Sequence, residues 1–339
     1  MVVATFGPSD LSSFYSTPEA VLKNIESCEI ACANSYDPRQ VSNLFALIKK
    51  KKINVINSHG YRADFIGLIA SRFFKIPIVP TFHGWTAVNL KIKLFEKLDE
   101  FVFKRAKHIF TVSRANSTLL QQKGIPECKI TVIPNAIDPE VYKGTSKFEN
   151  LENLKSSLGF HNREKVLISI GRLSKEKGHE IALKAFSNVI KEMPECRLVI
   201  LGNGPEETRL KTMATNLGIS DKVLFLGFQP NVVDYLNISD ICLLTSFTEG
   251  LPTVILEAFM SSKFVIATSV GGTPEVVQDK RTGILIPPGD IGKLSQETVF
   301  YLKNDGEREK ISKAAFQFVM ENYTFDSHVG KMEKVLSLL

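Results

Sequence analysis

Short apolar runs alternate with longer amphipathic stretches along the whole chain. The apolar runs are rich in β-branched residues and have the length of buried strands. In the first half the expected strands are Val2–Phe6, Ile53–Asn57, Ile78–Phe82, His108–Val112 and Lys129–Ile133. In the second half they are Val166–Ile170, Arg197–Leu201, Val223–Leu226, Ile241–Thr245 and Val265–Thr268.

Helical patterns fill the intervals between these runs. The expected helices include Val41–Lys51, Phe65–Phe74, His179–Lys191, Pro205–Leu217, Glu307–Asn322 and Thr324–Leu339. Regular alternation of strand and helix predicts α/β domains with parallel sheets that are covered on both faces. The polar stretch Tyr142–Asn153 is the expected linker between two doubly wound domains that face each other across a cleft. Ligands are expected at the carboxyl ends of the strands.

Length and composition fit two globular domains in tandem. The chain has 339 residues, of which 44% are hydrophobic and 23% charged, so disorder, collagen and a coiled coil are excluded as the main architecture. No apolar run approaches the roughly 18 residues of a membrane-spanning helix. The N-terminus has no basic stretch before an apolar one, so no secretion signal is predicted and a cytoplasmic chain is expected.

The cysteines and histidines do not predict a metal site. The five cysteines are scattered, without a Cys-x-x-Cys pair, and no two of the six histidines have the spacing of metal ligands. Reduced, buried thiols are therefore expected rather than a disulfide framework. No Asp-x-Asp occurs, so the usual carboxylate grip on a Mg²⁺–diphosphate is missing.

The positive charge is concentrated in the first half. Residues 1–145 hold 19 Lys and Arg against 12 Asp and Glu, whereas the remainder holds 23 against 24. Two interpretations of this positive charge are open. The basic residues form solvated helix faces, or they attract an anionic membrane surface or an anionic acceptor. Nucleic acid is not expected as a partner, because the basic stretches lack interleaved aromatic residues. The basic residues concerned are Lys49–Lys52, Lys91, Lys93, Lys97, Lys104, Arg105 and Lys107.

The strand expected at 166–170 runs into a turn bounded by two glycines. Gly171 and Gly178 enclose Arg172 and Lys177, and a helical pattern follows. Glycines let the backbone approach a ligand, and a helix N-terminus offers unpaired N–H groups to an anion. The turn is therefore a candidate anion site, with a turn of solvated basic residues as the alternative.

The next expected strand ends in a second glycine turn, Gly202-Asn203-Gly204. A lone Gly-x-Gly is a weak signal. Backbone approach to a ligand and a bare tight turn both explain it.

The segment at 248–258 is the most informative. Gly250 and Pro252 mark a turn, and Pro252 suits the first helical position because no N–H is needed there. The backbone amides from Gly250 through Leu251 to Thr253 would point from the helix start toward an anion such as a diphosphate.

Two glutamates, eight residues apart, belong to the same segment. Glu249 precedes the expected helix and Glu257 lies inside it. A carboxylate accepts two hydrogen bonds side by side, so each can hold vicinal hydroxyls of a sugar or a ribose. The alternative makes Glu249 only a favourable charge near a helix start and Glu257 a surface residue. The apolar neighbours Leu256 and Ala258 favour a partly enclosed Glu257.

Together these motifs resemble the donor-binding domain of retaining GT-B glycosyltransferases of glycosyltransferase family 4. The matching motifs of the second half are GRLSKEKG (171–178), LGNGP (201–205), LGF (226–228), EGLP with its second glutamate (249–257), VGGTPE (270–275) and TGILIPPGD (282–290). Those of the first half are SHGYRAD (58–64), TFHGWT (81–86), VSRAN (112–116) and IPNAID (133–138). The resemblance covers nearly the whole chain. It implies an acceptor-side Rossmann-like domain at 1–145, a donor domain at 146–322, and a C-terminal helix at 323–339 that packs back on the first domain.

The resemblance also implies roles for matching residues. Arg172 and Lys177 would bind the donor diphosphate, and Glu257 would hold the ribose hydroxyls. Glu249, with the amides of residues 250–253, would contact the transferred sugar and its phosphate.

In the first domain, the resemblance places His83 in the cleft beside the anomeric carbon, near the acceptor. A satisfied histidine before a tight turn at Gly84 is the alternative. His59 receives no role, because a purely structural interpretation is stronger there.

The activity so implied moves a sugar from a nucleotide-diphosphate sugar, such as a UDP- or GDP-sugar, to a carbohydrate or lipid-linked acceptor with retention of anomeric configuration. Cell-surface polysaccharide or glycolipid synthesis is the expected setting, with peripheral attachment at the inner face of the membrane. Front-side displacement needs no protein nucleophile and double displacement needs one; both stay open. No metal or other cofactor is expected, since Arg172, Lys177 and the helix-start amides can stabilise the leaving diphosphate.

Members of that family usually begin with a strand, a glycine-rich loop and a helix before the segment that Val2–Phe6 resembles. About one βα unit, roughly 30–40 residues, is therefore expected to be missing, either because the start of the sequence is assigned too late or because the protein is a shortened form. This motivates a second hypothesis, a non-catalytic nucleotide-sugar-binding or regulatory subunit of the same fold. A dinucleotide-dependent oxidoreductase is disfavoured, because Gly7-Pro8 follows the first strand in place of Gly-x-Gly-x-x-Gly.

Overall fold

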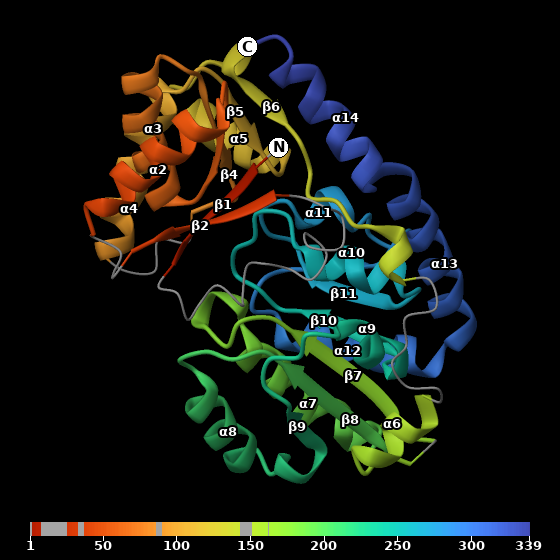
Figure 1. Ribbon diagram of the computed structural model, residues 1–339. Coiled ribbons are helices and arrows are strands. Elements are labelled where there is room, and N and C mark those ends of the chain that lie inside the picture. The colour runs from red at the N-terminus through yellow and green to blue at the C-terminus, as the bar shows by residue number, and fades with distance from the viewer. Residues whose placement is uncertain (1, 8–25, 33–36, 86–89, 143–150, 162) are drawn as a thin grey trace. The chain divides into compact units, whose positions relative to one another are not determined.

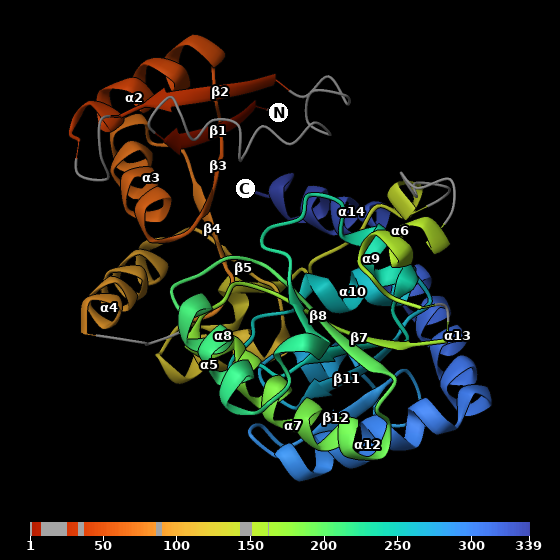
Figure 2. The ribbon, with the colours of Figure 1, turned by 90° about the horizontal axis from the view of Figure 1, so that it is seen from below.

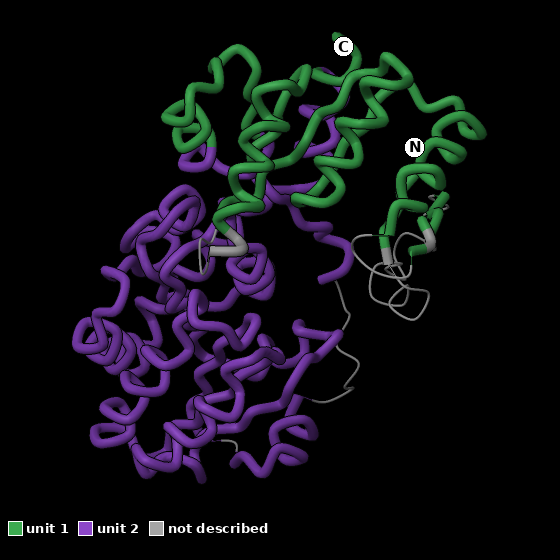
Figure 3. The backbone as a smooth tube through the Cα atoms, turned by 90° about the vertical axis from the view of Figure 1, so that its left-hand side faces the viewer, with its two compact units in different colours: residues 1–111, 117–132, 335–339 green, residues 112–116, 133–334 purple. Residues whose placement is uncertain are grey.

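The computed structural model describes residues 2–7, 26–32, 37–85, 90–142, 151–161 and 163–339 (Figure 1). The chain forms two compact units, shown in two colours in Figure 3. Unit 1 comprises Met1–Thr111, Ser117–Val132 and Val335–Leu339, and unit 2 comprises Val112–Asn116 and Ile133–Lys334. The domain boundary expected at 145/146 lies outside the described residues, and the three predicted domain ranges stay a prediction.

Six parallel strands form the sheet of unit 2, in the order β12-β11-β10-β7-β8-β9 (Figure 1). The chain starts at β7, builds outward to β9, and then returns to place β10 on the other side of β7. This is the doubly wound topology, with its switch point between β7 and β10. The strands are β7 (Lys165–Ile170), β8 (Cys196–Leu201), β9 (Val223–Phe225), β10 (Ile241–Leu244), β11 (Phe264–Thr268) and β12 (Ile284–Ile286).

Helices cover both faces of this sheet. On one face α7 (His179–Glu192) and α12 (Ile291–Lys303) lie side by side (Figure 2). On the other face α10 (Thr253–Met260) packs against α9 (Val232–Ile238) and α13 (Asp305–Asn322). Each face of the sheet has its own hydrophobic core. Leu167 belongs to the core on one face and its neighbour Ile168 to the core on the other, because successive side chains of a strand point to opposite faces. A sheet buried on both faces explains the continuous apolar runs of the sequence.

Unit 1 contains two sheets among its described residues. Four parallel strands follow each other in chain order, β3 (Ile56–His59), β4 (Ile78–Phe82), β5 (Ile109–Thr111) and β6 (Ile130–Val132). Strand β1 (Val2–Gly7) pairs in parallel with β2 (Glu26–Ala31) and forms a separate sheet with it, visible in Figure 2. The helices are α2 (Arg39–Lys51), α3 (Tyr61–Phe74), α4 (Leu90–Arg105) and α5 (Arg114–Gln122), of which α5 begins in unit 2.

The remaining elements are short or terminal. They are α6 (Leu151–Ser157), α8 (Glu207–Asn216), α11 (Thr273–Val276), α14 (Phe325–Leu336) and the 3-10 turns η2 (Glu127–Lys129), η3 (Pro139–Tyr142), η4 (Lys175–Lys177) and η5 (Ser220–Lys222). None of the described helices is long and apolar enough to cross a bilayer.

The structure corrects some predicted boundaries. The strand expected at Ile53–Asn57 begins at Ile56, because the Ile53 amide donates to Ile48 O and closes the end of α2. Of the expected linker, residues 143–150 lie outside the described part of the chain, and Leu151–Asn153 already belong to helix α6. Strands β2 and β12 are additional to the predicted set.

Candidate active site

The candidate site of unit 2 lies at the carboxyl edge of its sheet. The strand order reverses between β7 and β10, and in doubly wound sheets ligands bind outside the carboxyl ends of the strands at such a switch point. The predicted donor residues occupy these two loops, the loop after β8 and helix α10.

The loop after β7 carries the two predicted cations. Arg172 is exposed, and Lys177 lies in the 3-10 turn η4, just before Gly178 caps helix α7. Gly178 has φ +63°, and a Cβ at this position would lie 2.1 Å from the Thr245 carbonyl oxygen. Only glycine fits here, and the loop after β7 therefore lies directly against the loop after β10.

The buried side chain of His179 supports the loop after β7. His179 Nδ1 lies 3.1 Å from Ser169 Oγ, and its Nε2 lies 3.2 Å from the Arg172 carbonyl oxygen. Desolvation lowers the pKa of His179 to about 4, so the ring is neutral near pH 7. Because a carbonyl oxygen only accepts, Nε2 carries the hydrogen and holds the backbone of Arg172 in place.

Lys177 and Glu249, which are 72 residues apart, meet in an ion pair. Lys177 Nζ donates to Glu249 Oε1 at 2.7 Å, and the Ser246 hydroxyl donates to the same oxygen at 2.6 Å. The Glu249 side chain is only 7% exposed and that of Lys177 is 28% exposed. The structure thus places Lys177, which is predicted to bind the diphosphate, in contact with Glu249, which is predicted to bind the transferred sugar.

The loop after β10 ends in α10 with a small correction to the prediction. Pro252 has ψ 112° and is the N-cap, so the helix begins at Thr253 and not at the proline. Leu251 is buried, which fixes the loop on the core. The amides of the first residues of α10 lack acceptors one turn earlier in the helix, as at any helix start, and are candidate donors to an anion.

Glu257 lies one turn further along α10 and is half-buried, as its apolar neighbours predict. Desolvation raises its pKa above the ordinary value of a glutamate. A ligand hydroxyl that donates to this carboxylate would offset the cost of burying its charge. Its role as a ribose ligand stays a prediction.

Close packing against the loop after β7 explains the two glycines in the turn after β8. A Cβ on Gly202 would lie 2.0 Å from the Gly171 carbonyl oxygen, and one on Gly204 would lie 2.2 Å from the Leu173 carbonyl oxygen. The side-chain oxygen of Asn203 accepts from the Phe228 amide at 3.0 Å. These three residues therefore hold the loops after β7, β8 and β9 together, a role that local sequence does not reveal.

A second pair of glycines supports the Glu249 loop. A Cβ on Gly271 would lie 1.8 Å from the Glu249 carbonyl oxygen, and one on Gly272 would lie 2.1 Å from the Gly250 carbonyl oxygen. The Gly272 amide also donates to Gly250 O at 3.0 Å. In the sequence these two glycines are marked only by the family motif VGGTPE, which gives no role for them.

Glu275 of the same motif caps another helix. Its two carboxylate oxygens each accept at 3.0 Å, one from the amide of Arg114 and the other from that of Ala115, at the start of α5. The Tyr323 hydroxyl donates to the Glu275 carbonyl oxygen at 2.9 Å. Glu275 thus joins three segments of unit 2 that are distant in sequence.

The remaining predicted site residue, His83, belongs to unit 1. It directly follows β4, and its exposed ring lies 2.9 Å from that of His59 between Nε2 and Nδ1. Desolvation lowers its pKa below the ordinary value. Its predicted place beside the anomeric carbon stays a prediction.

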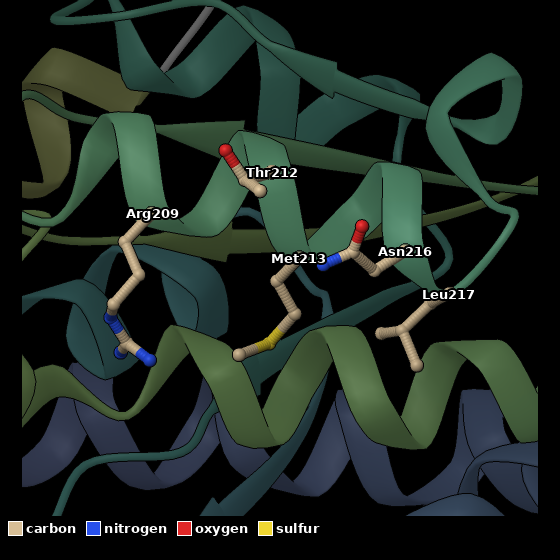
Figure 4. A pocket seen from close by; sticks show the side chains of 5 residues that line it. All are labelled: Arg209, Thr212, Met213, Asn216 and Leu217. Carbon is tan, nitrogen blue, oxygen red and sulfur yellow. The ribbon is translucent and has the colours of Figure 1, made fainter.

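A surface hollow of about 410 Å³ lies along helix α8 (Figure 4). It is lined by Arg209, Thr212, Met213, Asn216 and Leu217, all from one helix and its end. None of the predicted donor residues lines it.

The fold agrees with solved glycosyltransferases. The Anabaena protein HepE, solved in complex with UDP and glucose, matches with a TM-score of 0.88 at 22% identity, over 100% of this chain and 92% of that one. The two parallel α/β units therefore have the GT-B fold.

Comparison with protein families identifies the family of glycosyltransferases to which the chain belongs. The family described as Glycosyltransferase Family 4 matches residues 3–141, and Glycosyl transferases group 1 matches residues 150–318. The chain belongs to the group 1 glycosyltransferases of family 4.

Two curated relatives cover most of the chain. N-acetyl-alpha-D-glucosaminyl L-malate synthase of Bacillus anthracis is 28% identical over 304 residues, 88% of this chain and 78% of the relative. An Escherichia coli UDP-Gal:alpha-D-GlcNAc-diphosphoundecaprenol alpha-1,3-galactosyltransferase is 26% identical over 306 residues, again 88% and 78%. The name of the second relative specifies a galactosyltransferase, which supports a transferase function.

Proposed function

We propose that the enzyme transfers a sugar from a nucleotide-diphosphate sugar to a carbohydrate or lipid-linked acceptor, with retention of anomeric configuration and without a divalent metal ion. The observation that carries this proposal is the Lys177–Glu249 pair at the carboxyl edge of the doubly wound sheet. The loops that hold it are locked together by backbone contacts that only glycine permits.

The charges of the site suit this reaction. Cleavage of a nucleotide–sugar bond leaves negative charge on the diphosphate. Arg172, Lys177 and the first amides of α10 supply donors for that charge at one edge of the sheet, and donors aimed at a developing charge stabilise a transition state. Lys177 can turn from Glu249 to the phosphates, which frees the Glu249 carboxylate for hydroxyls of the sugar.

The comparisons suggest which donor to test first. HepE was solved with UDP and glucose, and the name of the E. coli relative specifies UDP-Gal and a lipid-linked acceptor. We therefore propose a UDP-sugar as donor and a lipid-linked or carbohydrate acceptor.

The function is tested by assaying transfer from UDP-, GDP-, ADP- and dTDP-sugars to lipid-linked and free sugar acceptors. We expect one nucleotide class to give a glycoside whose anomeric NMR coupling matches that of the donor. A product of inverted configuration would contradict retention. A donor that binds but gives no product with any acceptor would indicate the non-catalytic subunit instead.

Peripheral contact with an anionic membrane is part of the same proposal. On helix α4, the side chains of Leu94, Lys97, Phe101 and Arg105 are exposed and recur at three- or four-residue intervals, so they share one face. The neighbouring helix α3 exposes 68% of Phe73. Apolar side chains interleaved with cations are typical of a helix that lies on a membrane surface.

We expect the protein to float with vesicles of anionic lipid and to remain unbound with zwitterionic ones. Phe101→Ser should reduce the bound fraction several-fold, whereas Phe300→Ser, at a position 51% exposed in unit 2, should not change it. Equal loss in both variants would contradict a specific role of α4.

A further inference from the structure

Two histidines meet at the carboxyl edge of the four-stranded sheet in unit 1. His59 is the last residue of β3 and His83 follows the last residue of the neighbouring parallel strand β4. Each is followed by a glycine with positive φ, +88° at Gly60 and +106° at Gly84. The chain therefore turns sharply after both histidines, and the rings remain at the strand ends with their planes 34° apart.

The chain of hydrogen bonds behind these rings begins at Asn57. Its side-chain nitrogen lies 2.7 Å from the Val79 carbonyl oxygen and 2.9 Å from Thr81 Oγ1. A backbone carbonyl oxygen can only accept, so the nitrogen end of the Asn57 amide must face Val79. The oxygen end consequently faces His59, whose Nε2 lies 2.9 Å away.

This orientation determines where the hydrogens lie. The Asn57 oxygen can only accept, so His59 Nε2 must carry a hydrogen. In a neutral imidazole the other nitrogen, Nδ1, is then an acceptor. His59 Nδ1 lies 2.9 Å from His83 Nε2, so at a pH where both rings are neutral the hydrogen between them belongs to His83 Nε2.

We propose that Asn57 and His59 are positioning residues that fix His83 as its Nε2–H tautomer, so that His83 Nδ1 accepts a hydrogen bond from a hydroxyl of the acceptor. This rests on the proposed function and on the predicted role of His83 near the acceptor. His83 Nε2 is committed to His59, and among the described residues of unit 1 none hydrogen-bonds its Nδ1. A nitrogen with a fixed lone pair selects a hydroxyl that donates, and it orients that hydroxyl before the reaction.

Two matched variants separate this role from simple packing. In His59→Asn an amide oxygen can take the place of ring Nδ1 and still accept from His83. In His59→Gln the terminal amide reaches toward the place of ring Nε2, and a methylene lies near His83 instead. Partners that fix a histidine tautomer in metal sites are worth about 10–100-fold. We expect kcat to fall by that factor in His59→Gln and by only a few-fold in His59→Asn, with donor KM little changed in both.

The tautomer is measured directly by NMR of the full chain labelled with ¹⁵N-histidine, with His83→Ala to assign the signal. The wild type and His59→Asn should show His83 protonated at Nε2, and His59→Gln should lose this preference. Protonation at Nδ1 in the wild type, equal kcat in the Asn and Gln variants, or unchanged kcat in His83→Ala would overturn the proposal. If the wild type transfers no sugar from any donor, the proposed function fails, while the NMR result still decides the tautomer.

Discussion

Lys177→Ala is expected to lower the turnover number by about 10²–10³-fold, the usual cost of removing one preorganised donor to a developing anion. The side chain supplies a positive charge that lies 2.7 Å from Glu249 at the switch point of the sheet. Steady-state kinetics with the best donor measures the loss. Lys177→Arg should recover part of it, because the charge is kept but its position changes.

Lys175→Ala is the matched control for this change. Lys175 lies in the same 3-10 turn and its side chain is exposed. Its removal should leave turnover within a few-fold of the wild type. Equal losses in both variants would mean that the net charge of the loop, and not the position of Lys177, determines the rate.

Gly271→Ala is expected to have the second large effect. Its φ of +50° disfavours any side chain by roughly 1–2 kcal/mol. Its Cβ would also lie 1.8 Å from the Glu249 carbonyl oxygen, so the Glu249 loop must move. A displacement of about 1 Å at a reacting centre costs on the order of 10²-fold in rate, and we expect a loss of that size together with a lower melting temperature.

Gly218→Ala separates conformational strain from displacement of the site. Gly218 has φ +69°, but a Cβ there would meet no atom within 4 Å. The variant should therefore share the loss of about 1–2 kcal/mol in unfolding free energy and keep normal turnover. If Gly271→Ala kept normal turnover as well, the glycine contacts would be unimportant for the site.

The sequence predicts the site best where its signals are local. The strand–turn–helix patterns at Arg172 and Glu249 are contained within a few residues, and the doubly wound topology then brings them to one edge. The predicted and observed bounds of the strand Ile78–Phe82 agree. All five of its residues are buried, and a strand buried on both faces appears in the sequence as a short apolar run. The predicted start of α10 is one residue too early. Pro252 has an extended ψ because of the way the loop packs, and local sequence does not reveal this packing.

Contacts between distant segments could not be predicted in this way. Gly202 and Gly271 look like ordinary turn residues, and their need for glycine appears only against carbonyl groups of another loop. Glu275 caps a helix that begins 161 residues earlier. The partnership of His59 with His83 depends on the register of β3 and β4, which periodicity does not determine.

We propose that cationic side chains and helix-start amides of unit 2 bind a diphosphate without a divalent ion. Isothermal titration of the full chain with the preferred nucleotide sugar, in EDTA and then in excess Mg²⁺ or Mn²⁺, tests it most directly. We expect the same dissociation constant in both buffers and a marked weakening in Lys177→Ala. Binding that disappears in EDTA and returns with the metal would contradict the account.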